Sequence, residues 1–385
     1  MNAPALRFKN DDGRDFLEWN SAKLTKLARI YDGTHMTPDY KSAGVPFYSV
    51  EHVTSDNFNE TKYIAEDVYE KENKRVKLER GDILMTRIGD IGTPKFINWD
   101  VKASFYVSLA LIKQSKNINS LYLSHFIKTS IFQSELHQRT IHVAFPKKIN
   151  LGEIGECLVS YPVPEEQTKI ANFLTAVDEK ITHLTQKCEL LAQYKKGIMQ
   201  QIFSQELRFK DDDGQDFPEW SEVGFDDLFY VANNKKVQIK SSDFLEDGIT
   251  PIVDQGQKYI VGFTNQKEVY EDIPVIIFGD HTRIIKWIDF RFAAGADGTQ
   301  VLKSKNLLDL KFGYYALSNI ELPNLGYSRH MKELKEQLFM IPSSKAEQIK
   351  IANFLTAIDD KLTHTQAQLA VVKQYKQGLL QQMFV

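Results

Sequence analysis

The chain has little cysteine and no long apolar run. Only two cysteines, Cys157 and Cys188, occur among its 385 residues, and neither has a second thiol nearby. A disulfide framework or a cysteine-based metal site is therefore not indicated. No stretch of about 18 apolar residues is present, as a membrane-spanning helix would require, and the first residues lack the apolar core of a signal peptide. We expect a cytoplasmic protein with reduced thiols.

Neither sign of charge dominates, and two common cofactor loops are missing. The chain carries 48 Lys and Arg against 51 Asp and Glu, a net charge of −3, with a pI of about 6.3. This balance argues against a protein that coats nucleic acid through bulk charge. It does not exclude a DNA-binding protein whose basic groups are local. Neither the GxGxxG loop of dinucleotide sites nor the GxxxxGK[ST] phosphate loop is present.

Three segments occur twice. Leu6–Trp19 reads LRFKNDDGRDFLEW and Leu207–Trp220 reads LRFKDDDGQDFPEW, with eleven of fourteen positions identical. The motif EQTKIANFLTAVDEKITH at Glu166–His183 returns as EQIKIANFLTAIDDKLTH, with fourteen of eighteen identical, and QYKKGIMQQIF returns as QYKQGLLQQMF. The second and third repeats share one offset, 181 residues. Internal repetition on this scale indicates an architecture built from two equivalent halves.

The blocks between the repeats differ in sequence and length. They span 146 residues at 20–165 and 126 residues at 221–346. A repeated frame that carries two unlike inserts favours a holder for two non-identical recognition modules. Gene duplication followed by neutral drift is the alternative.

The second repeat predicts a long helix in each half. Apolar residues recur at steps of four and three from Glu166 to about Phe203 and again from Glu347 to Phe384, which is typical of a coiled coil. Each helix would be roughly 55 Å long at 1.5 Å per residue. The predicted helix-packing residues are Ile170, Leu174, Val177, Ile181, Leu184 and Leu191 in the first helix and Ile351, Leu355, Ile358, Leu362, Leu369 and Val372 in the second.

The variable blocks read as mixed α/β domains. Short strand-like runs such as VPFYSVEHV, GDILMTRIGDIGT and IPVIIFGDHTRIIKWIDF alternate with turns. Each block also contains one helical candidate, at 120–137 and 307–318. CLVSYPV and LFMIP read as the terminal strands that precede the long helices.

The order of the repeats is cyclic. The first helix runs directly into the second LRFK segment, whereas the second helix ends near the end of the chain. A pseudo-two-fold axis would place the C-terminus beside the N-terminus and make the two helices antiparallel, with a variable domain at either end. The predicted fold is therefore α+β, with two mixed α/β domains joined by two long helices in an antiparallel coiled coil.

This organisation resembles the specificity subunit of type I restriction–modification enzymes across essentially the whole chain. The motif that carries the resemblance is PVPEEQTKIANFLTAVDEKI at 162–181, and its second copy is PSSKAEQIKIANFLTAIDDKL from Pro342. The second copy has one extra residue and lacks the second proline, which affects only the local linker. The resemblance implies target-recognition domains at 1–165 and 207–346 and conserved helices at 166–206 and 347–385.

The resemblance also implies a role without catalysis. Each recognition domain would read one half of a bipartite, asymmetric site in double-stranded DNA. The helices would set the spacing and dock two modification subunits, which methylate adenine at N6 with S-adenosylmethionine. Restriction subunits that use ATP with Mg would join them. No Asp/Asn-Pro-Pro-Tyr/Phe motif for holding a flipped adenine occurs in the chain, so base flipping would belong to a partner. A non-DNA-binding coiled-coil adaptor and a stand-alone nuclease or methyltransferase are the rival interpretations.

Basic segments near the ends of the variable blocks are the candidate DNA contacts. Segments 136–152 and 322–332 contain no acidic residue, and two Arg-bearing turns follow apolar strands. Arg and Lys supply phosphate contacts, and long donors reach base edges. Thr34 and His35 are further candidates, similar to Lys235 and Lys236. The candidates are Arg87, Arg139, His142, Lys147, Lys148, Lys235, Lys236, His281, Thr282, Arg283, Arg329, His330 and Lys332. Solvated loops and turns with local Arg–Asp pairs are the alternative.

The DDG runs at 11–13 and 211–214 resemble half of a calcium loop. The rest of that ligand pattern, including the glutamate at the twelfth position, is missing. Turns whose flanking Phe and Trp pack on the helices are the favoured interpretation.

Overall fold

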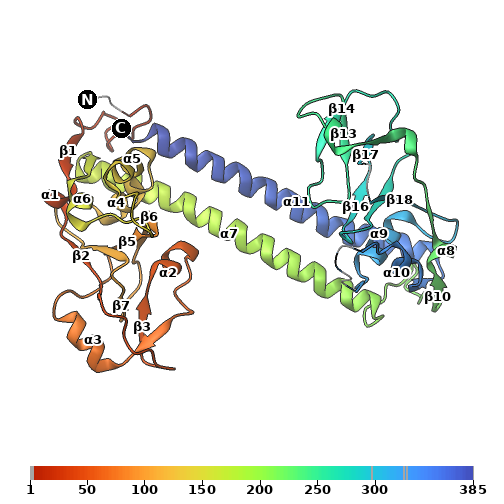
Figure 1. Ribbon diagram of the computed structural model, residues 1–385, viewed down its shortest axis with the longest axis horizontal. Helices are drawn as coiled ribbons and strands as arrows, with labels where there is room; N and C mark the ends of the chain where they lie inside the picture. Colours follow the sequence, from red (N-terminus) through yellow and green to blue (C-terminus); the bar gives the residue numbers. More distant parts are fainter. Residues whose placement is uncertain (1–3, 296–297, 324–325, 327, 385) are drawn as a thin grey trace. The chain divides into compact units, whose positions relative to one another are not determined.

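The computed structural model describes residues 4–295, 298–323, 326 and 328–384. The chain forms two compact units (Figure 1), one made of Met1–Thr185 with Ala367–Val385 and the other of Gln186–Gln366. The helices α7 (Pro164–Phe203) and α11 (Lys345–Gln382) each begin in one unit and end in the other. No helix in the described part of the chain is both long and apolar enough to cross a membrane.

The first unit holds two sheets and a separate strand pair. Its four-stranded sheet has the order β2-β8-β5-β6, its three-stranded sheet the order β4-β3-β7, and β1 pairs with β9. The strands are β1 (Asn20–Lys23), β2 (Ile30–Asp32), β3 (Val45–Tyr48), β4 (Lys62–Ile64), β5 (Ile83–Ile88), β6 (Asp90–Phe96), β7 (Ser104–Phe105), β8 (Leu109–Ile112) and β9 (Leu158–Tyr161). The helices besides α7 are α1 (Leu24–Leu27), α2 (Val50–Ser55), α3 (Glu66–Asn73), α4 (Ser120–Ile127), α5 (Ser130–Arg139) and α6 (Leu151–Glu156).

The second unit repeats this topology and adds one strand to the smaller sheet. Its sheets have the orders β11-β18-β15-β16 and β12-β17-β13-β14, and β10 pairs with β19. The strands are β10 (Trp220–Gly224), β11 (Phe229–Val231), β12 (Gln238–Ile239), β13 (Thr250–Val253), β14 (Gly262–Thr264), β15 (Val275–Gly279), β16 (Ile285–Ile288), β17 (Ala293–Gly295), β18 (Thr299–Ser304) and β19 (Leu338–Pro342). The helices are α8 (Phe225–Leu228), η1 (Lys235–Val237), η2 (Ser241–Asp243), α9 (Leu310–Ser318), α10 (Met331–Lys335) and α11.

The long helices pack on each other in opposite directions within each unit. In the first unit, Ile170 and Leu174 at the start of α7 share a core with Leu379 and Met383 at the end of α11. In the second unit, the end of α7 shares a core with the start of α11 through Met199, Ile202, Ile351 and Leu355. The predicted α+β class with two long antiparallel helices is confirmed. All twelve predicted helix-packing residues are buried or half-buried.

The expected cyclic arrangement is visible at the end of each helix. The backbone N–H of Leu6 donates to the carbonyl of Gln382 at 2.9 Å, and Leu207 donates to Gln201 at 3.0 Å. These two contacts are equivalent under the repeat, and the first places Leu6 beside the end of α11 (Figure 1). Each first-repeat segment therefore sits on the end of one long helix and the start of the other.

The repeated EQxK motif ties that first-repeat segment to the helix start. The fully buried Glu166 accepts hydrogen bonds from Arg7 Nε at 3.0 Å and Nη2 at 2.7 Å. These bonds raise the pKa of the Arg7 guanidinium above its ordinary value. Lys169 Nζ donates to the carbonyl of Lys9 at 3.0 Å and lies 2.6 Å from Asp11 Oδ1. Arg208, Glu347 and Lys350 make the equivalent contacts in the second unit.

Gln167 and Gln348, the glutamines of the motif, hold the variable domains. Gln167 Oε1 accepts the backbone N–H of Asn119 at 2.8 Å, and Gln348 Oε1 accepts that of Asp309 at 2.7 Å. Asn119 and Asp309 are the residues that cap α4 and α9, since their side chains accept N–H groups of the first turn. The EQxK motif therefore joins the first-repeat segment, the long helix and one helix of the variable domain in each half.

Two predictions about local structure were wrong. The single helix expected over 120–137 is two helices, α4 and α5, because Thr129 Oγ1 accepts the N–H of Phe132 at 3.3 Å and caps a new start. The strand-like run VPFYSVEHV is strand only as far as Tyr48 and continues as α2. His52 Nδ1 accepts the N–H of Ser49 at 3.0 Å, which stabilises that helix start.

The DDG segments are turns. Asn10 Oδ1 accepts the N–H groups of Asp12 at 3.1 Å and Arg14 at 2.8 Å, and Gly13 has a φ of 77° that glycine tolerates. The flanking rings pack edge to face, with centroids 5.7 Å apart for Phe8 and Phe173 of α7 and 6.3 Å apart for Trp19 and Phe384, which lies just beyond the end of α11.

Removing the arginine partner of the buried carboxylate should destabilise the fold. We expect Arg7→Met to lower the free energy of unfolding by about 3–5 kcal/mol, because Glu166 is left buried without its cation. Arg208→Met should cost less, since Trp220 Nε1 also donates to Glu347 at 3.2 Å, whereas Trp19 Nε1 has no hydrogen-bond partner among the described residues.

Calorimetric melting and denaturant titration of the full chain would measure the difference. Lys23→Met is the control, because the Lys23–Glu156 pair is exposed and worth no more than about 1 kcal/mol. Equal, small effects of all three substitutions would contradict the anchoring role of the buried pair.

Candidate nucleic-acid interface

Two candidate regions of the first unit lie in direct contact. The N–H of Gly89, in the β5–β6 turn, donates to the carbonyl of Lys147 at 2.9 Å, and Lys148 forms β-bridges with Ile88 and with Ile141. Gly89 has a φ of 82°, which the tight turn requires and glycine permits. The structure thus joins the Arg-bearing turn to the acid-free segment, although about 60 residues separate them in the sequence.

Arg87 supports this loop from within. Its side chain is only 8% exposed, and it donates from Nε to the carbonyl of Ile149 at 3.2 Å and from Nη1 to that of Val107 at 2.7 Å. Burial lowers the pKa of its guanidinium. Because Arg87 is buried and its Nε and Nη1 donate to backbone carbonyls, it positions the loop and is not placed to contact DNA.

Arg139 is also engaged within the protein. It lies 3.2 Å from Glu135 Oε2 and 3.5 Å from Glu153 Oε2, so two carboxylates from α5 and α6 offset its charge. Neighbouring His142 is exposed, and its Nε2 contacts the carbonyl of His137 at 2.9 Å. His142 stays a candidate, whereas Arg139 acts mainly between helices.

The tip of this loop combines exposed apolar and basic side chains. Val143 and Phe145 are 97% and 104% exposed, and Lys147 and Lys148 are exposed beside them. Sequence reasoning missed the two apolar residues because it searched for cations. The signal available was the apolar run VAFP between His142 and the two lysines in HVAFPKK, in a segment without acids.

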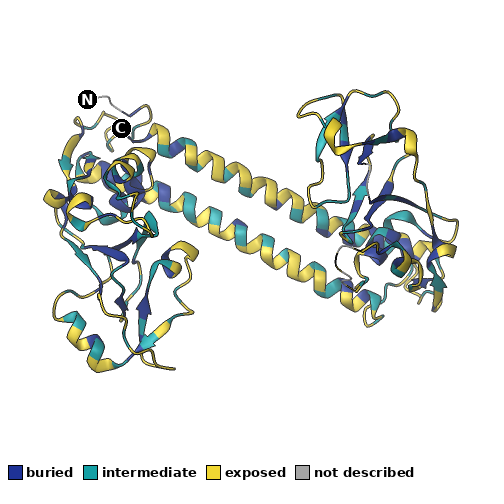
Figure 2. Cartoon of the chain, viewed as in Figure 1, coloured by how far each residue is buried: buried dark blue, intermediate teal, exposed yellow. Residues whose placement is uncertain are grey.

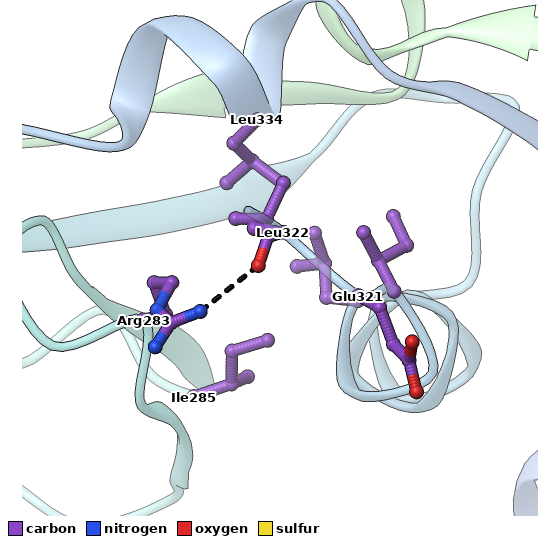
Figure 3. A pocket seen from close by; sticks show the side chains of 7 residues that line it. Arg283, Ile285, Glu321, Leu322 and Leu334 are labelled. Atoms are coloured by element: carbon purple, nitrogen blue, oxygen red, sulfur yellow. Dashed lines mark hydrogen bonds between the residues drawn. The ribbon is translucent and has the colours of Figure 1, made fainter. Parts of the chain in front are cut away.

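The second unit brings together the equivalent two regions. The turn between β15 and β16 meets segment 322–332, of which residues 324, 325 and 327 lie outside the described part of the chain. Arg283 Nη1 donates to the carbonyl of Leu322 at 2.9 Å, as Figure 3 shows, and His281 Nδ1 contacts that of Ser328 at 3.2 Å. The N–H of His330 donates to the carbonyl of Asp280 at 2.8 Å.

His330 and Arg283 have structural roles there. His330 is fully buried, with Nδ1 2.9 Å from the carbonyl oxygen of Asp280. Arg283 is half-buried with a φ of 62° and lines a cavity of about 320 Å³ together with Ile285 and Leu334 (Figure 3). Both side chains hold the turn against the loop, so we withdraw them from the candidate base contacts.

Four of the candidate cations in the second unit are exposed. Arg329 and Lys332 flank the buried His330, and Lys235 and Lys236 lie on η1. Thr282 is exposed, but its hydroxyl donates to the carbonyl of Gln255 at 2.5 Å. In the first unit, Thr34 is buried and His35 Nε2 lies 2.7 Å from Asp32, so neither is well placed to bind DNA.

Within residues 4–295, 298–323, 326 and 328–384, no group of three or more His, Cys, Asp or Glu side chains is arranged to hold a metal ion.

Known proteins share this organisation. The family model described as the type I restriction modification DNA specificity domain matches twice, at residues 17–192 and 218–374. A putative type I restriction enzyme MjaX specificity subunit from Methanocaldococcus jannaschii is 24% identical over 89% of this chain and 87% of its own length. The MjaIX specificity subunit of the same organism is 21% identical over 97% of this chain and 94% of its own.

A solved structure has the same fold. The S subunit of a type I restriction–modification system from M. genitalium superposes with a TM-score of 0.68, at 16% sequence identity, and covers 100% of this chain and 99% of that one. With the family model matching each of the two halves, the chain belongs to the type I restriction–modification DNA specificity family, whose members are the non-catalytic specificity subunits of these complexes.

Proposed function

We propose that this chain reads a bipartite site in double-stranded DNA, one half-site for each of the recognition domains at 1–165 and 207–346. The observation that carries the proposal is the pairing of one sheet topology with two unlike loop sequences. Strands β5, β6 and β8 have the same order and direction as β15, β16 and β18, yet the loops between them differ. Equivalent scaffolds with different loops suit the reading of two different half-sites.

The loop at 141–148 is the proposed contact of the first domain. Lys147 and Lys148 would neutralise phosphates and set the register, while Phe145 would contact base edges such as a thymine methyl group. The loop base is held by Arg87 and by the Gly89–Lys147 hydrogen bond, so the tip is presented without large motion of its ends. His142 is placed to add a further donor.

In the second domain, Arg329 and Lys332 are the proposed contacts on the equivalent loop, with His281 on the adjoining turn. Lys235 and Lys236 on η1 would bind phosphate. Both pairs of cations are exposed and therefore able to release condensed counterions from DNA.

Two modification subunits would dock on the long helices, one in each half. Leu190 and Tyr194 on α7 are 65% and 51% exposed, and Val371 and Tyr375 on α11 are 65% and 54% exposed. The two pairs are equivalent under the 181-residue repeat, and four-residue spacing puts each pair on one helix face. Large exposed apolar side chains at repeated positions suit two copies of one partner, and long exposed stretches run along both helices (Figure 2).

The partners would supply the chemistry. S-adenosylmethionine would bind the modification subunits, and ATP with Mg the restriction subunits. This chain would select the DNA sequence and hold the modification subunits in position.

Mapping of N6-methyladenine in a host genome tests the function directly. We expect a split motif with a fixed gap when this chain is expressed with its modification subunit, and no such motif without the chain. Methylation that is the same with and without the chain, despite an assembled complex, would favour an adaptor that does not read DNA.

Salt-dependent binding should separate the roles of the loop residues. Lys147→Ala with Lys148→Ala should reduce the slope of log affinity against log salt by about 2, since each phosphate contact contributes about 0.9. Phe145→Ala should weaken binding roughly tenfold with an unchanged slope, because its contact is apolar. Binding of the assembled complex to DNA carrying the mapped site would be measured by fluorescence anisotropy. Lys71→Ala on α3 is the control, and unchanged slopes in all variants would remove the loop from the interface.

Substitution of one exposed tyrosine should remove one modification subunit. We expect Tyr194→Glu or Tyr375→Glu to change the stoichiometry from two modification subunits to one, and the double variant to abolish binding, because a charge is buried in an apolar interface. Native mass spectrometry would count the subunits. Gln193→Glu adds the same charge at a neighbouring exposed position and should leave two bound. Retention of both partners by the double variant would refute this docking face.

A further inference from the structure

A polar cluster occurs at the same place in each unit, where a variable domain meets the long helices. In the first unit, His125 on α4 contacts Thr175 Oγ1 on α7 through Nε2 at 3.2 Å. In the second, the Tyr315 hydroxyl on α9 lies 3.1 Å from Thr356 Oγ1 on α11. Thr175 and Thr356 are equivalent under the 181-residue repeat.

An aspartate and a lysine complete each cluster. Asp178 pairs with Lys376 from α11 in the first unit, and Asp359 lies 2.5 Å from Lys195 of α7 in the second. These pairs are also equivalent under the repeat, with the two helices exchanged. We call the two sets the clamps: His125, Thr175, Asp178 and Lys376 in the first unit, and Tyr315, Thr356, Asp359 and Lys195 in the second.

The clamps connect three elements at a buried position. His125 and Tyr315 are both buried, and their aspartate and lysine partners are partly buried. Burial lowers the pKa of His125 to about 3, so its ring is neutral at ordinary pH. Each clamp thus links one variable-domain helix to both long helices through directional contacts, which an apolar contact of the same area would not provide.

A second fixed point lies at the start of α4 and α9. Gln167 and Gln348 hold the caps Asn119 and Asp309, six residues before His125 and Tyr315. Two fixed points on a short helix define its direction as well as its location. The clamp therefore controls the angle at which each variable domain is mounted on the long helices.

We propose that the clamps determine how strictly the complex discriminates between DNA sites with different gaps. This inference rests on the proposed reading of a bipartite site. Adding one base pair to the gap moves the second half-site by about 3.4 Å along the axis and rotates it by about a tenth of a turn. A domain whose mounting angle is fixed cannot follow that rotation, whereas a loosened domain can.

The two clamps differ in strength. The Tyr315 hydroxyl donates to Asp359 Oδ2 at 2.8 Å, whereas His125 Nδ1 lies 3.9 Å from Asp178 Oδ2 and has no hydrogen-bond partner among the described residues. A bond to a charged acceptor is stronger than a contact beyond hydrogen-bonding range. The second domain is accordingly the more tightly mounted, and removal of its clamp should have the larger effect.

The test uses the complex of the full chain with its modification subunits on a plasmid library. The library carries both mapped half-sites separated by the native gap and by gaps one base pair shorter and longer. Tyr315→Phe deletes only the clamp hydroxyl. We expect it to raise methylation at the altered gaps about fivefold or more relative to the native gap, without changing either half-site sequence. His125→Leu should have a smaller effect, and His125→Tyr should match or exceed the original stringency.

A matched variant separates this role from stability. Tyr122→Phe removes the hydroxyl of another buried tyrosine, which donates to the carbonyl of Ser160 at 2.7 Å outside the clamps. It should lower the melting temperature as Tyr315→Phe does but leave the gap profile unaltered. An unaltered gap profile in both Tyr315→Phe and Tyr315→Phe with Thr356→Val would overturn the proposal. Failure of the unsubstituted complex to methylate any bipartite site would instead refute the proposed function, and the clamps with it.

Discussion

The fold depends on a buried carboxylate at the start of each long helix. Glu166 and Glu347 have no exposed side-chain surface, and each is held by an arginine from the first-repeat segment of its half. A buried charge is tolerated only when it is paired and hydrogen-bonded, so helix and segment must form together. The adjacent glutamine then holds the cap of a variable-domain helix. Because these contacts lie within four residues of one motif, the variable blocks are free to change around it.

The two variable domains show what that freedom permits. Their variable blocks differ in sequence and length, yet their larger sheets have the same strand order. Their smaller sheets share one antiparallel and one parallel pair, and the second domain adds the parallel strand β12. Alternating apolar residues and suitable turn residues suffice to specify such a sheet, and many different sequences contain both patterns. Loops at one edge can then diverge, as the apolar tip at Phe145 in the first domain and the cations Arg329 and Lys332 in the second illustrate.

Burial distinguishes the arginines that support these loops from the exposed cations that can contact a partner. Arg87 lies near the end of β5 and Arg283 in the β15–β16 turn, and both donate to carbonyls of the neighbouring loop. Carbonyl oxygens of a loop that lacks regular pairing need donors, and a guanidinium supplies several in one plane. Lys147 and Lys148 are exposed beside the first of these loops, and within the described part of the chain their side chains donate to no carbonyl. Arginine therefore serves in this chain both as a support, at Arg87 and Arg283, and as a proposed DNA contact, at Arg329. The two roles differ in how far the side chain is buried.

The sequence by itself determined the family, the α+β class, the cyclic repeat and the long helices, because identical segments and a seven-residue apolar period are local patterns. It also located the turn and the loop of each candidate interface. Only the tertiary structure decided that Arg87, Arg283 and His330 face inward, that Phe145 faces outward, and that 120–137 breaks at Thr129. These outcomes depend on hydrogen bonds between residues far apart in the chain, such as Arg87 with Ile149, and a one-dimensional pattern carries no record of such partners.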